Sequence, residues 1–433
     1  LATIVAGSSA PGLEAVRGLA IEESGRAESS ALGHGAKLTA MNAALVNATA
    51  GHALDFDMND DRTYYKSSVV VVPAALALAE RLGGVGGSDF LTAVCVGIDL
   101  GIRIGLAVWP KPSHVLSQMV GGFGAVASAA RLLGLDEEQF LDALGILYCQ
   151  VAASGLSTAS PSLTKRLTPG LAARAAVFSA LLAARGFKGG RNVLAGPAGY
   201  FRRYHGTEGD HAEILGDLGR RWEVVHVGPK GYPCCRVLHA PIDAALAVAR
   251  AHDIAPEEIE RVVVRGSRFD IHIMEDPFTE EGIERRRHPR GVVDAQFSIH
   301  WAAASALARR EVFIDSFTDA ALQDPLVNAL SDRVEVIAAR SMERPGLLLA
   351  PASVEVHTRA RGRFSATAEY AKGNPHNPVT PAETATLMRQ SAAYAARPLD
   401  AGRVEAAIAA VEALDEADDM RRLAALLCPA AEH

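Results

Sequence analysis

The residues best suited to acid–base chemistry gather in one short stretch, residues 47–73, between two apolar runs that predict helices. Two of its acids, Asp55 and Asp57, and its one lysine, Lys66, are the first candidates. A carboxylate can bind a substrate hydroxyl or orient a neighbour, and a lysine whose pKa is lowered by burial or nearby cations can move a proton. This stretch is therefore the best candidate for an active-site loop.

The sequence leaves the role of Lys66 open. It can transfer a proton, form a Schiff base with a keto substrate, or be a solvated loop lysine. Asp55 is the preferred partner for it, whereas Tyr64 and Tyr65 either donate protons or pack. His52 stands at the end of the preceding Ala-rich run, where capping or packing is the simpler interpretation.

Four acids of the stretch are close enough in sequence to raise the question of a divalent cation: Asp55, Asp57, Asp60 and Asp61. Their spacing fits no calcium loop, because the central glycine and the terminal glutamate are missing. Cys234 and Cys235 are adjacent but have no second cysteine pair, so they do not indicate a zinc site. From these spacings we expect no metal site.

The elements that must position these groups are helical. Apolar periodicity predicts helices at about 11–23, 37–53, 73–82, 88–106, 121–134 and 136–151. Pro73 is placed at the start of its helix, because the fixed φ of proline suits a first turn. Residues 153–169 are predicted to form a loop that carries Lys165, and an Ala-rich helix is predicted to follow it.

The composition changes near Trp222. β-Branched runs predict strands at 224–227, 262–264, 334–337 and 354–357, with helices at about 237–252 and 295–308. Thr380 and Glu383 form a capping box ahead of a helical tail. We therefore predict a mainly α fold with an α+β inset: an all-helical domain from residues 1–220 and 376–433, and a smaller α+β lid domain from 221–375. The cleft between two domains is the default ligand site.

Composition limits the class of protein. The 433 residues carry a net charge of −7 with scattered basic residues, so we expect no nucleic acid partner. Five cysteines, few and odd in number, fit a reducing cytoplasm. No apolar run reaches about 18 residues and no charged leader is present, so neither a membrane span nor a signal peptide is expected. The chain begins at Leu1 in mid-pattern, and we expect an N-terminal segment to precede it.

Five segments, in this order, resemble the MmgE/PrpD family: His-Ala-Leu-Asp-Phe-Asp (52–57), Ala-Ala-Arg-Leu-Leu-Gly-Leu (129–135), Thr-Lys-Arg-Leu-Thr-Pro-Gly (164–170), Lys-Gly-Tyr-Pro-Cys-Cys-Arg (230–236) and Tyr-Ala-Lys-Gly-Asn-Pro-His-Asn-Pro (370–378). The family includes 2-methylcitrate dehydratases, cis-aconitate decarboxylases and iminodisuccinate epimerases. The resemblance implies a helical domain with an α+β lid, cofactor-independent chemistry on small polycarboxylates, and a homodimer.

The chain also departs from the family pattern. Asp55 and Asp57 match, but Lys66 stands where the family has a histidine associated with catalysis. A second family histidine falls next to His114, and a third is Thr168 here. The resemblance therefore implies a retained acid, Asp55, and a lysine in place of the usual imidazole.

On this basis the catalytic roles are assigned to Asp55, Lys66, Lys165 and Lys230. Seven further residues are assigned to substrate binding: Asn59, Tyr65, His114, Arg166, Cys235, Arg236 and His239. The cations would hold carboxylates, arginine in bidentate pairs and lysine as a point charge. His239 would follow Cys235 by one helical turn and face the same cleft.

The expected function is that of a cofactor-independent lyase, a dehydratase or decarboxylase, on a small hydroxy- or unsaturated polycarboxylate. Proton transfer next to a carboxylate would drive it, with Lys66 replacing the histidine. Two alternatives stay open: an epimerase or other isomerase of a small dicarboxylate on the same scaffold, and a non-catalytic carboxylate-binding homologue.

Overall fold

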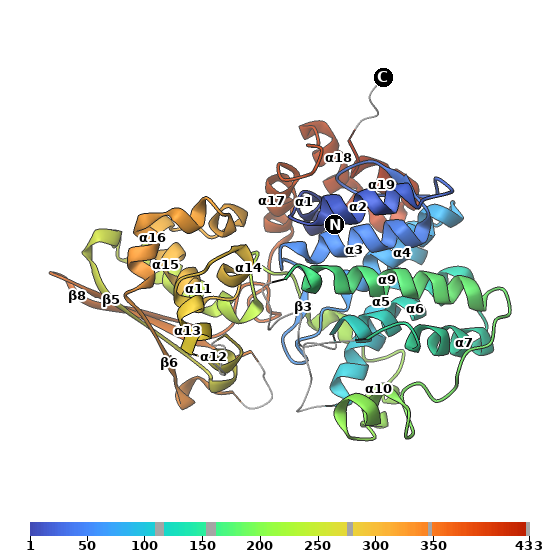
Figure 1. Cartoon of the computed structure of the whole chain (residues 1–433), viewed down its shortest axis with the longest axis horizontal. Coiled ribbons are helices and arrows are strands. Elements are labelled where there is room, and N and C mark those ends of the chain that lie inside the picture. The colour runs from blue at the N-terminus through green and yellow to red at the C-terminus, as the bar shows by residue number, and fades with distance from the viewer. Residues whose placement is uncertain (109–116, 153–161, 275–279, 345–348, 430–433) are drawn as a thin grey trace. The chain divides into compact units, whose positions relative to one another are not determined.

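The computed structural model describes residues 1–108, 117–152, 162–274, 280–344 and 349–429. Its chain forms two compact units, residues 1–227 with 380–433 and residues 228–379 (Figure 1). His114, a predicted substrate-binding residue, lies outside the described residues.

The first unit is built from helices. Its described helices are α1 (Ala2–Gly7), α2 (Leu13–Glu22), α3 (Ala40–Ala53), α4 (Ser68–Leu82), α5 (Gly87–Leu106), α6 (Ser117–Leu133), α7 (Glu137–Tyr148), α9 (Thr164–Ala183), α10 (His211–Leu215), α17 (Pro381–Ala392), α18 (Ala401–Glu412) and α19 (Met420–Leu426), with short 3₁₀ or π turns at Phe201–His205, Glu223–His226 and Leu414–Glu416. Short strands β1 (Ser29–Ser30) and β2 (Lys37–Leu38) pair antiparallel, and β3 is Asn59–Asp60. Helix α3 packs against α4 and α9, and α6 packs against α4, α5 and α9 (Figure 1).

Helix α3 is the centre of this unit, since all but one of its residues are buried. Such a helix is apolar on every side and needs close neighbours. A Cβ atom on Gly170 of α9 would lie 2.1 Å from Oγ1 of Thr49 and 2.5 Å from the Leu45 carbonyl oxygen, so the two backbones approach closely there. One turn earlier in α9, Lys165 lies beside His52 in the last turn of α3.

Two helices that contain a proline begin earlier than the sequence predicts. Helix α4 starts at Ser68 and α9 at Thr164, so Pro73 and Pro169 lie inside helices and do not start them. An interior proline costs about 3 kcal/mol, but each buried valine returns about 1.5–3 kcal/mol, and the extra turn of α4 buries Val69–Val71. The predicted loop 153–169 is therefore wrong from residue 164 onward, and Lys165 lies on a helix.

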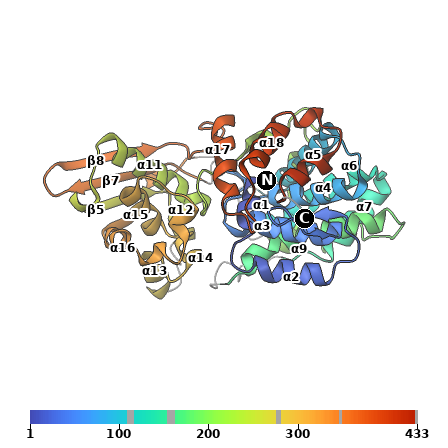
Figure 2. The same ribbon diagram turned by 90° about the horizontal axis from the view of Figure 1, so that it is seen from above.

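The second unit combines a sheet with helices. Its elements are β4 (Val227–Gly228, at the boundary), α11 (His239–Ala251), β5 (Ile259–Gly266), α12 (Arg268–Met274), α13 (Glu280–Arg287), α14 (Val292–Ala295), α15 (Ile299–Arg309), α16 (Pro325–Ser331), β6 (Val334–Ala338), β7 (Ala352–Thr358) and β8 (Gly362–Ala368), with 3₁₀ turns at Arg236–Leu238, Pro256–Glu258, Ile314–Phe317, Ala321–Gln323 and Arg340–Met342. The sheet order is β6-β5-β7-β8, with β5 and β6 parallel and the other pairs antiparallel. Helix α11 packs on β7 and β8, which lie side by side in Figure 2.

The predicted fold class, mainly α with an α+β inset, is confirmed. Three of the four predicted strands lie within β5, β6 and β7. The fourth, predicted at 224–227, is wrong at 224–226, because Glu223–His226 forms a 3₁₀ turn, and only Val227 belongs to a strand, β4. There the Glu223 carboxylate and backbone N–H bind Arg62 and Asp99, which fixes the chain in a turn. Among the described helices, none has the length and apolarity that a membrane crossing requires.

Candidate active site

Five polar side chains meet where α3 ends and α9 begins: His52, Asp55, Asp57, Lys66 and Lys165, which we call the lysine cluster. All are buried apart from a partial exposure of Lys165. Nζ of Lys66 lies 2.9 Å from Oδ1 of Asp55, and Nζ of Lys165 lies 2.8 Å from the same oxygen. Two ammonium groups therefore share one carboxylate oxygen.

The cluster continues from Lys165 to an imidazole and a second acid. Nζ of Lys165 lies 3.1 Å from Nε2 of His52, and Nδ1 of His52 lies 2.9 Å from Oδ1 of Asp57. An ionised carboxylate only accepts hydrogen bonds, so Nδ1 carries the imidazole proton and Nε2 accepts from the lysine. The cluster is thus one continuous hydrogen-bonded chain from Asp57 to Lys66.

Burial sets the protonation states. It lowers the pKa of His52 to about 4, against the opposing effect of Asp57, and Lys165 and Lys66 lower it further. Burial also lowers the pKa of Lys165 to about 8, although Asp55 favours the charged form; the charge of Lys66 adds to the lowering. At pH 7 the imidazole is neutral, and Lys165 is a charged group that gives up its proton more easily than an ordinary lysine.

The backbone turns sharply at Asp55. Its φ is +50°, in the left-handed region, and its N–H donates to the His52 carbonyl at 2.9 Å. Aspartate enters this region more readily than most residues, but the conformation still carries strain, which is common at functional sites. The turn brings the Asp55 carboxylate within reach of both lysines.

His52, Asp55 and Asp57 also satisfy one geometric requirement of a metal site, because one ligand atom from each lies within 4.8 Å of the others. However, the Lys165 ammonium is already at hydrogen-bonding distance from both His52 and Asp55. A metal ion would have to displace this cation and would meet the charge of Lys66 nearby. The geometry therefore favours an ammonium over a metal at this position.

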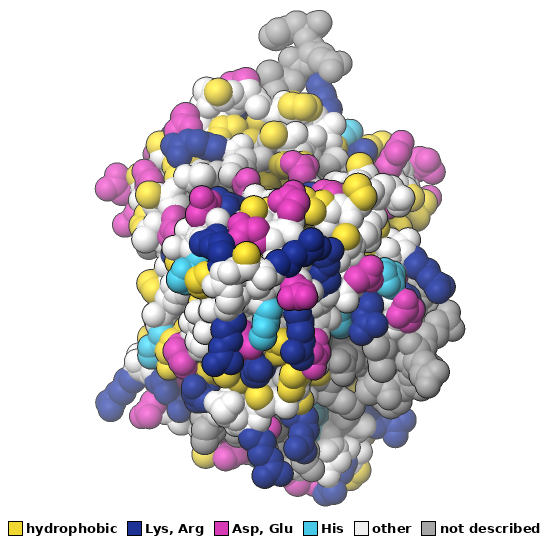
Figure 3. Space-filling model, turned by 90° about the vertical axis from the view of Figure 1, so that its left-hand side faces the viewer, with side chains coloured by type: hydrophobic (Ala, Val, Ile, Leu, Met, Phe, Trp, Pro, Cys, Tyr) yellow, Lys and Arg dark blue, Asp and Glu magenta, His cyan; other side chains and the backbone are white. Residues whose placement is uncertain are grey.

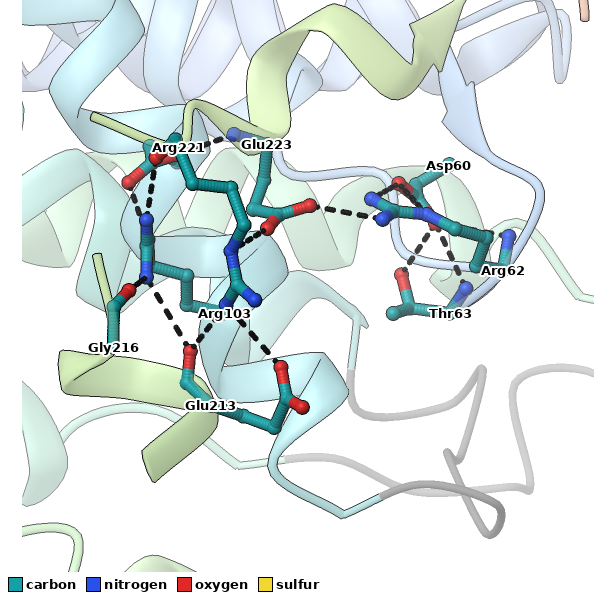
Figure 4. Close-up of polar contacts among 9 residues, drawn as sticks. Asp60, Arg62, Thr63, Arg103, Glu213, Gly216, Arg221 and Glu223 are labelled. Atoms are coloured by element: carbon teal, nitrogen blue, oxygen red, sulfur yellow. Dashed lines mark hydrogen bonds and ion pairs between the residues drawn. The ribbon is translucent and has the colours of Figure 1, made fainter. Parts of the chain in front are cut away.

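A second network consists mainly of arginines and acids and begins at Asp60, three residues after Asp57. Its members are Asp60, Arg62, Thr63, Asp99, Arg103, Glu213, Gly216, Arg221 and Glu223, which we call the arginine network; Figure 4 labels all of them except Asp99. Asp60 accepts hydrogen bonds from the backbone N–H groups of Arg62 and Thr63, both at 2.9 Å. The Arg62 guanidinium lies 2.7 Å from Asp60 and 2.9 Å from Glu223. Figure 4 shows Arg62 reaching from its loop toward Glu223.

Arg103, on α5, is the fully buried centre of this network. Its Nε lies 2.7 Å from Asp99, and it donates to the carbonyl groups of Gly216 at 2.8 Å and Arg221 at 2.5 Å. The guanidinium therefore pins the segment around residues 213–223 onto α5. Through Glu223 and Arg62, this anchor also holds the loop that carries the lysine cluster.

Comparison with known sequences decides the family. A sequence profile of the MmgE/PrpD N-terminal domain matches residues 1–212, and one of the MmgE/PrpD C-terminal domain matches residues 232–415. The chain belongs to the MmgE/PrpD family. The resemblance stated from the motifs is thereby confirmed.

Several curated members of the MmgE/PrpD family are similar to this chain. The cis-aconitate decarboxylase-like protein oryM of Aspergillus oryzae is 27% identical over 74% of this chain and 69% of its own length. Cis-aconitate decarboxylase of Aspergillus terreus is 26% identical over 92% of this chain and 83% of its own. The Homo sapiens cis-aconitate decarboxylase is 26% identical over 89% and 79%. These relatives are named for a lyase reaction, the breaking of a carbon–carbon bond.

Three predicted MmgE/PrpD site residues lie near the lysine cluster in sequence but have contacts of their own. The Asn59 amide donates to the Asp60 carbonyl at 2.9 Å, inside the loop. Tyr65 is fully buried and belongs to the core of the first unit. Arg166 donates to the Pro11 carbonyl at 3.2 Å, and burial lowers its pKa. Their assignment to substrate binding stays a prediction.

The motif at 230–236 belongs to the second unit. Nζ of Lys230 donates to the Cys234 carbonyl at 2.9 Å, and the backbone N–H of Cys235 donates to the Gln296 carbonyl at 2.9 Å. Both Lys230 and Cys235 are buried. The proposed catalytic role of Lys230 and the binding role of Cys235 also stay predictions.

The other predicted residues of this unit lie together. The Arg236 guanidinium lies 3.2 Å from Nδ1 of His239 and donates to the Lys372 carbonyl at 2.6 Å. Gly373 has a φ of +91°, and a Cβ on it would lie 1.7 Å from the Pro229 carbonyl oxygen, so this position requires glycine. The motifs at 230–236 and 370–378 are thus joined by backbone contact and by Arg236.

Sequence reasoning brought Asp55, Lys66 and Lys165 forward, and the structure brings these three together. It gave less weight to His52 and Asp57, which complete the cluster. A signal for them was present: a histidine at a helix end with an acid five residues later, inside the motif. The contact depends on the left-handed turn at Asp55, which no periodicity indicates.

Proposed function

We propose that this MmgE/PrpD protein is a cofactor-independent decarboxylase of a small unsaturated polycarboxylate of the cis-aconitate type. One observation carries the proposal: Lys165, with its pKa lowered to about 8, is held between a carboxylate and a neutral imidazole in a buried cluster. The relatives named cis-aconitate decarboxylase support this reaction type.

The chemistry sets two demands. Decarboxylation of an unsaturated tricarboxylate breaks the bond between carbon and one carboxylate, which leaves as CO₂. The bonding electron pair moves through the adjacent double bond to the far carbon, and that carbon takes up a proton. The site must therefore hold the remaining carboxylates with cations and deliver one proton.

The lysine cluster contains groups for both demands. Lys165 is the proton donor, because an acid with a pKa near the working pH is both protonated and able to transfer. Asp57 and His52 position it, the acid by fixing the imidazole tautomer and the imidazole by accepting from the ammonium. Lys66 is the cation for a substrate carboxylate, and Asp55 keeps both ammonium groups in place until the substrate arrives.

The test is incubation of the purified protein with cis-aconitate in D₂O, with CO₂ followed by mass spectrometry and the acid by NMR. We expect CO₂ release and a dicarboxylate with one deuterium at the protonated carbon. Lys165→Ala should lower the rate by about 10²–10⁴-fold, as for loss of a general acid. The control Lys188→Ala removes a lysine that is 72% exposed and should leave the rate unchanged.

Failure to release CO₂ from cis-aconitate and from citrate-like and 2-methylcitrate-like acids would overturn the proposal. Solvent deuterium in the substrate carbon without CO₂ or olefin formation would instead indicate the isomerase alternative. Saturable binding with neither reaction would indicate the non-catalytic alternative.

A further inference from the structure

The second unit contains a cavity of about 640 Å³ whose lining includes none of the family motif residues. Strands β5 and β6 and helices α13 and α15 contribute to its wall, through residues that include Arg261, Arg287, His300, Arg333 and Glu335. The volume falls within the range of small-molecule sites, about 300–1,000 Å³. The mixed basic and acidic lining indicates a polar ligand.

His300 is the most deeply buried ionisable group of this cavity. It lies in the first turn of α15, only 4% of its surface is exposed, and within the described structure its imidazole has no hydrogen bond, ion pair or ring contact. Buried polar side chains nearly always have a partner. Burial lowers its pKa to about 4, and Arg287 and His288 lower it further, so the ring is neutral and offers one N–H donor.

Arg287, the last residue of α13, is half-buried and is the second candidate ligand-binding group of the cavity. Its Nε is buried without a hydrogen-bond partner, and the described residues provide no carboxylate that pairs with it. The other arginines of the wall differ from it. Arg261 forms an ion pair with Glu335, and Arg333 donates to the Ile259 carbonyl at 2.5 Å.

The acids that line the cavity do not pair with the positively charged Arg287. Glu335 is already neutralised by Arg261, and Asp332 lies 3.1 Å from Nε2 of His288. Glu260 is exposed to water. Figure 3 shows one face of the molecule, on which basic, acidic and histidine side chains are interspersed.

We propose that this cavity is a second ligand site, which binds a small anion with a carboxylate or phosphate group through Arg287 and His300. A guanidinium presents two parallel N–H donors to such an oxyanion, and the neutral imidazole adds one more. Among the described residues neither side chain has a hydrogen-bond or ion-pair partner, so the ligand would supply the acceptors for them. The proposal does not depend on the reaction proposed above.

The test uses the full chain labelled with ¹³C at histidine, with the His300 signal assigned by comparison with His300→Gln. Inorganic phosphate and succinate are titrated separately, because the two acids distinguish a phosphate ligand from a carboxylate ligand. We expect a saturable shift of the His300 signal with at least one of them. The signal of His52 reports independently on any binding at the lysine cluster.

Two variants sharpen the result. Arg287→Gln should weaken the apparent affinity by about tenfold or more, the effect of removing a charged hydrogen-bond donor. Arg359→Gln removes the same charge from an exposed position of the same unit, outside the cavity lining, and should leave the affinity unchanged. No saturable shift with either acid, or an equal effect of both variants, would overturn the proposal. A folded Arg287→Gln protein is verified by its unchanged remaining histidine signals.

Discussion

The loop after α3 supplies side chains to two buried charge networks that differ in kind. The lysine cluster combines Lys66 and Lys165 with Asp55 and a neutral His52, and the pKa of Lys165 is lowered to about 8. The arginine network begins at Asp60, and its cations are guanidinium groups. Arginine keeps its charge throughout the pH range of proteins, whereas a buried lysine does not. One network is therefore suited to proton transfer, and the other to holding the chain.

Their hydrogen bonding supports this division. The Arg103 guanidinium donates to one carboxylate and to the carbonyl groups of a neighbouring segment, so its contacts fix backbone. The Lys165 ammonium instead lies at hydrogen-bonding distance from two side chains, the His52 imidazole and the Asp55 carboxylate. We infer that substitutions in the lysine cluster change mainly activity, and that substitutions in the arginine network change mainly stability.

The largest expected effect is on activity, from Lys165→Met. Methionine fills a similar volume but has no proton to give, so kcat for CO₂ release should fall by about 10²–10⁴-fold. Asp55 keeps Lys66 as a partner. The substitution also removes the cost of burying the charged form of Lys165, a cost that is present below pH 8 because burial lowers its pKa. Urea unfolding should therefore show a loss of only about 1–2 kcal/mol.

The next largest effect is on stability, from Arg103→Met. It leaves Asp99 buried without its cation and frees the carbonyl groups of residues 214–221, so the free energy of unfolding should fall by about 3–5 kcal/mol. The kcat of the folded fraction should change little. Arg131→Met, which breaks an exposed pair with Asp89, is the control and should cost about 1 kcal/mol or less. If Lys165→Met destabilises the protein as much as Arg103→Met, the division between the networks is wrong.

These networks also show how far the sequence predicts the structure. Helical periodicity and β-branched runs predicted the fold class, and the capping box of Thr380 and Glu383 does start α17. Both errors at prolines arise from tertiary contacts. Pro73 was taken as the first turn of its helix, but the burial of Val69–Val71 extends α4 ahead of it. Pro169 was taken as the end of a loop, but α9 begins at Thr164, and its first turn carries Lys165 to Asp55 and His52. Lys165 was therefore expected on a loop and lies on a helix. Residue preferences at helix ends indicate where a helix can begin, whereas tertiary packing decides at which residue it does begin.

The candidate site was predictable only in part for a similar reason. Family motifs drew attention to Asp55, Lys66 and Lys165, which the structure brings together. The pairing of His52 with Asp57 requires the left-handed turn at Asp55. The arginine network joins residues 60–63, 99–103 and 213–223, and no sequence pattern links segments so far apart. Such contacts appear only once the helices are packed.

Asp57→Asn should lower kcat less than Lys165→Met does. An asparagine can place its NH₂ group against Nδ1 of His52, and the imidazole proton then moves to Nε2, which no longer accepts from Lys165. We expect kcat to fall by about 10–100-fold, as for other outer partners of functional histidines, with KM nearly unchanged. Asp89→Asn makes the same change at an exposed acid and should have no effect. A rise in KM alone would instead assign Asp57 to substrate binding.

The smallest expected effect is a shift in the pH dependence of kcat, which also compares the two networks most directly. If protonated Lys165 is the acid, kcat should be constant at neutral pH and fall about tenfold per unit above pH 8. Lys66→Met removes a neighbouring positive charge that lowers the pKa of Lys165, and it removes the other ammonium that shares Oδ1 of Asp55 with Lys165. Both changes favour the protonated form of Lys165, so the pH at which kcat begins to fall should rise above 8; we call this fall the alkaline limb of the pH profile. The loss of a carboxylate-binding cation also raises KM.

The matched variant for this measurement is Arg62→Lys, which alters the same loop within the arginine network and keeps the charge paired with Asp60. It loses the two-sided contact of the guanidinium with Asp60 and Glu223, so we expect a modest loss of stability but an alkaline limb that stays near pH 8. If the alkaline limb moves equally in both variants, the position of the loop, and not the charge of Lys66, determines the pKa that kcat reports. A limb that stays in place in Lys66→Met would show that the titrating group is not Lys165, and the proton donor would then have to be sought outside the lysine cluster.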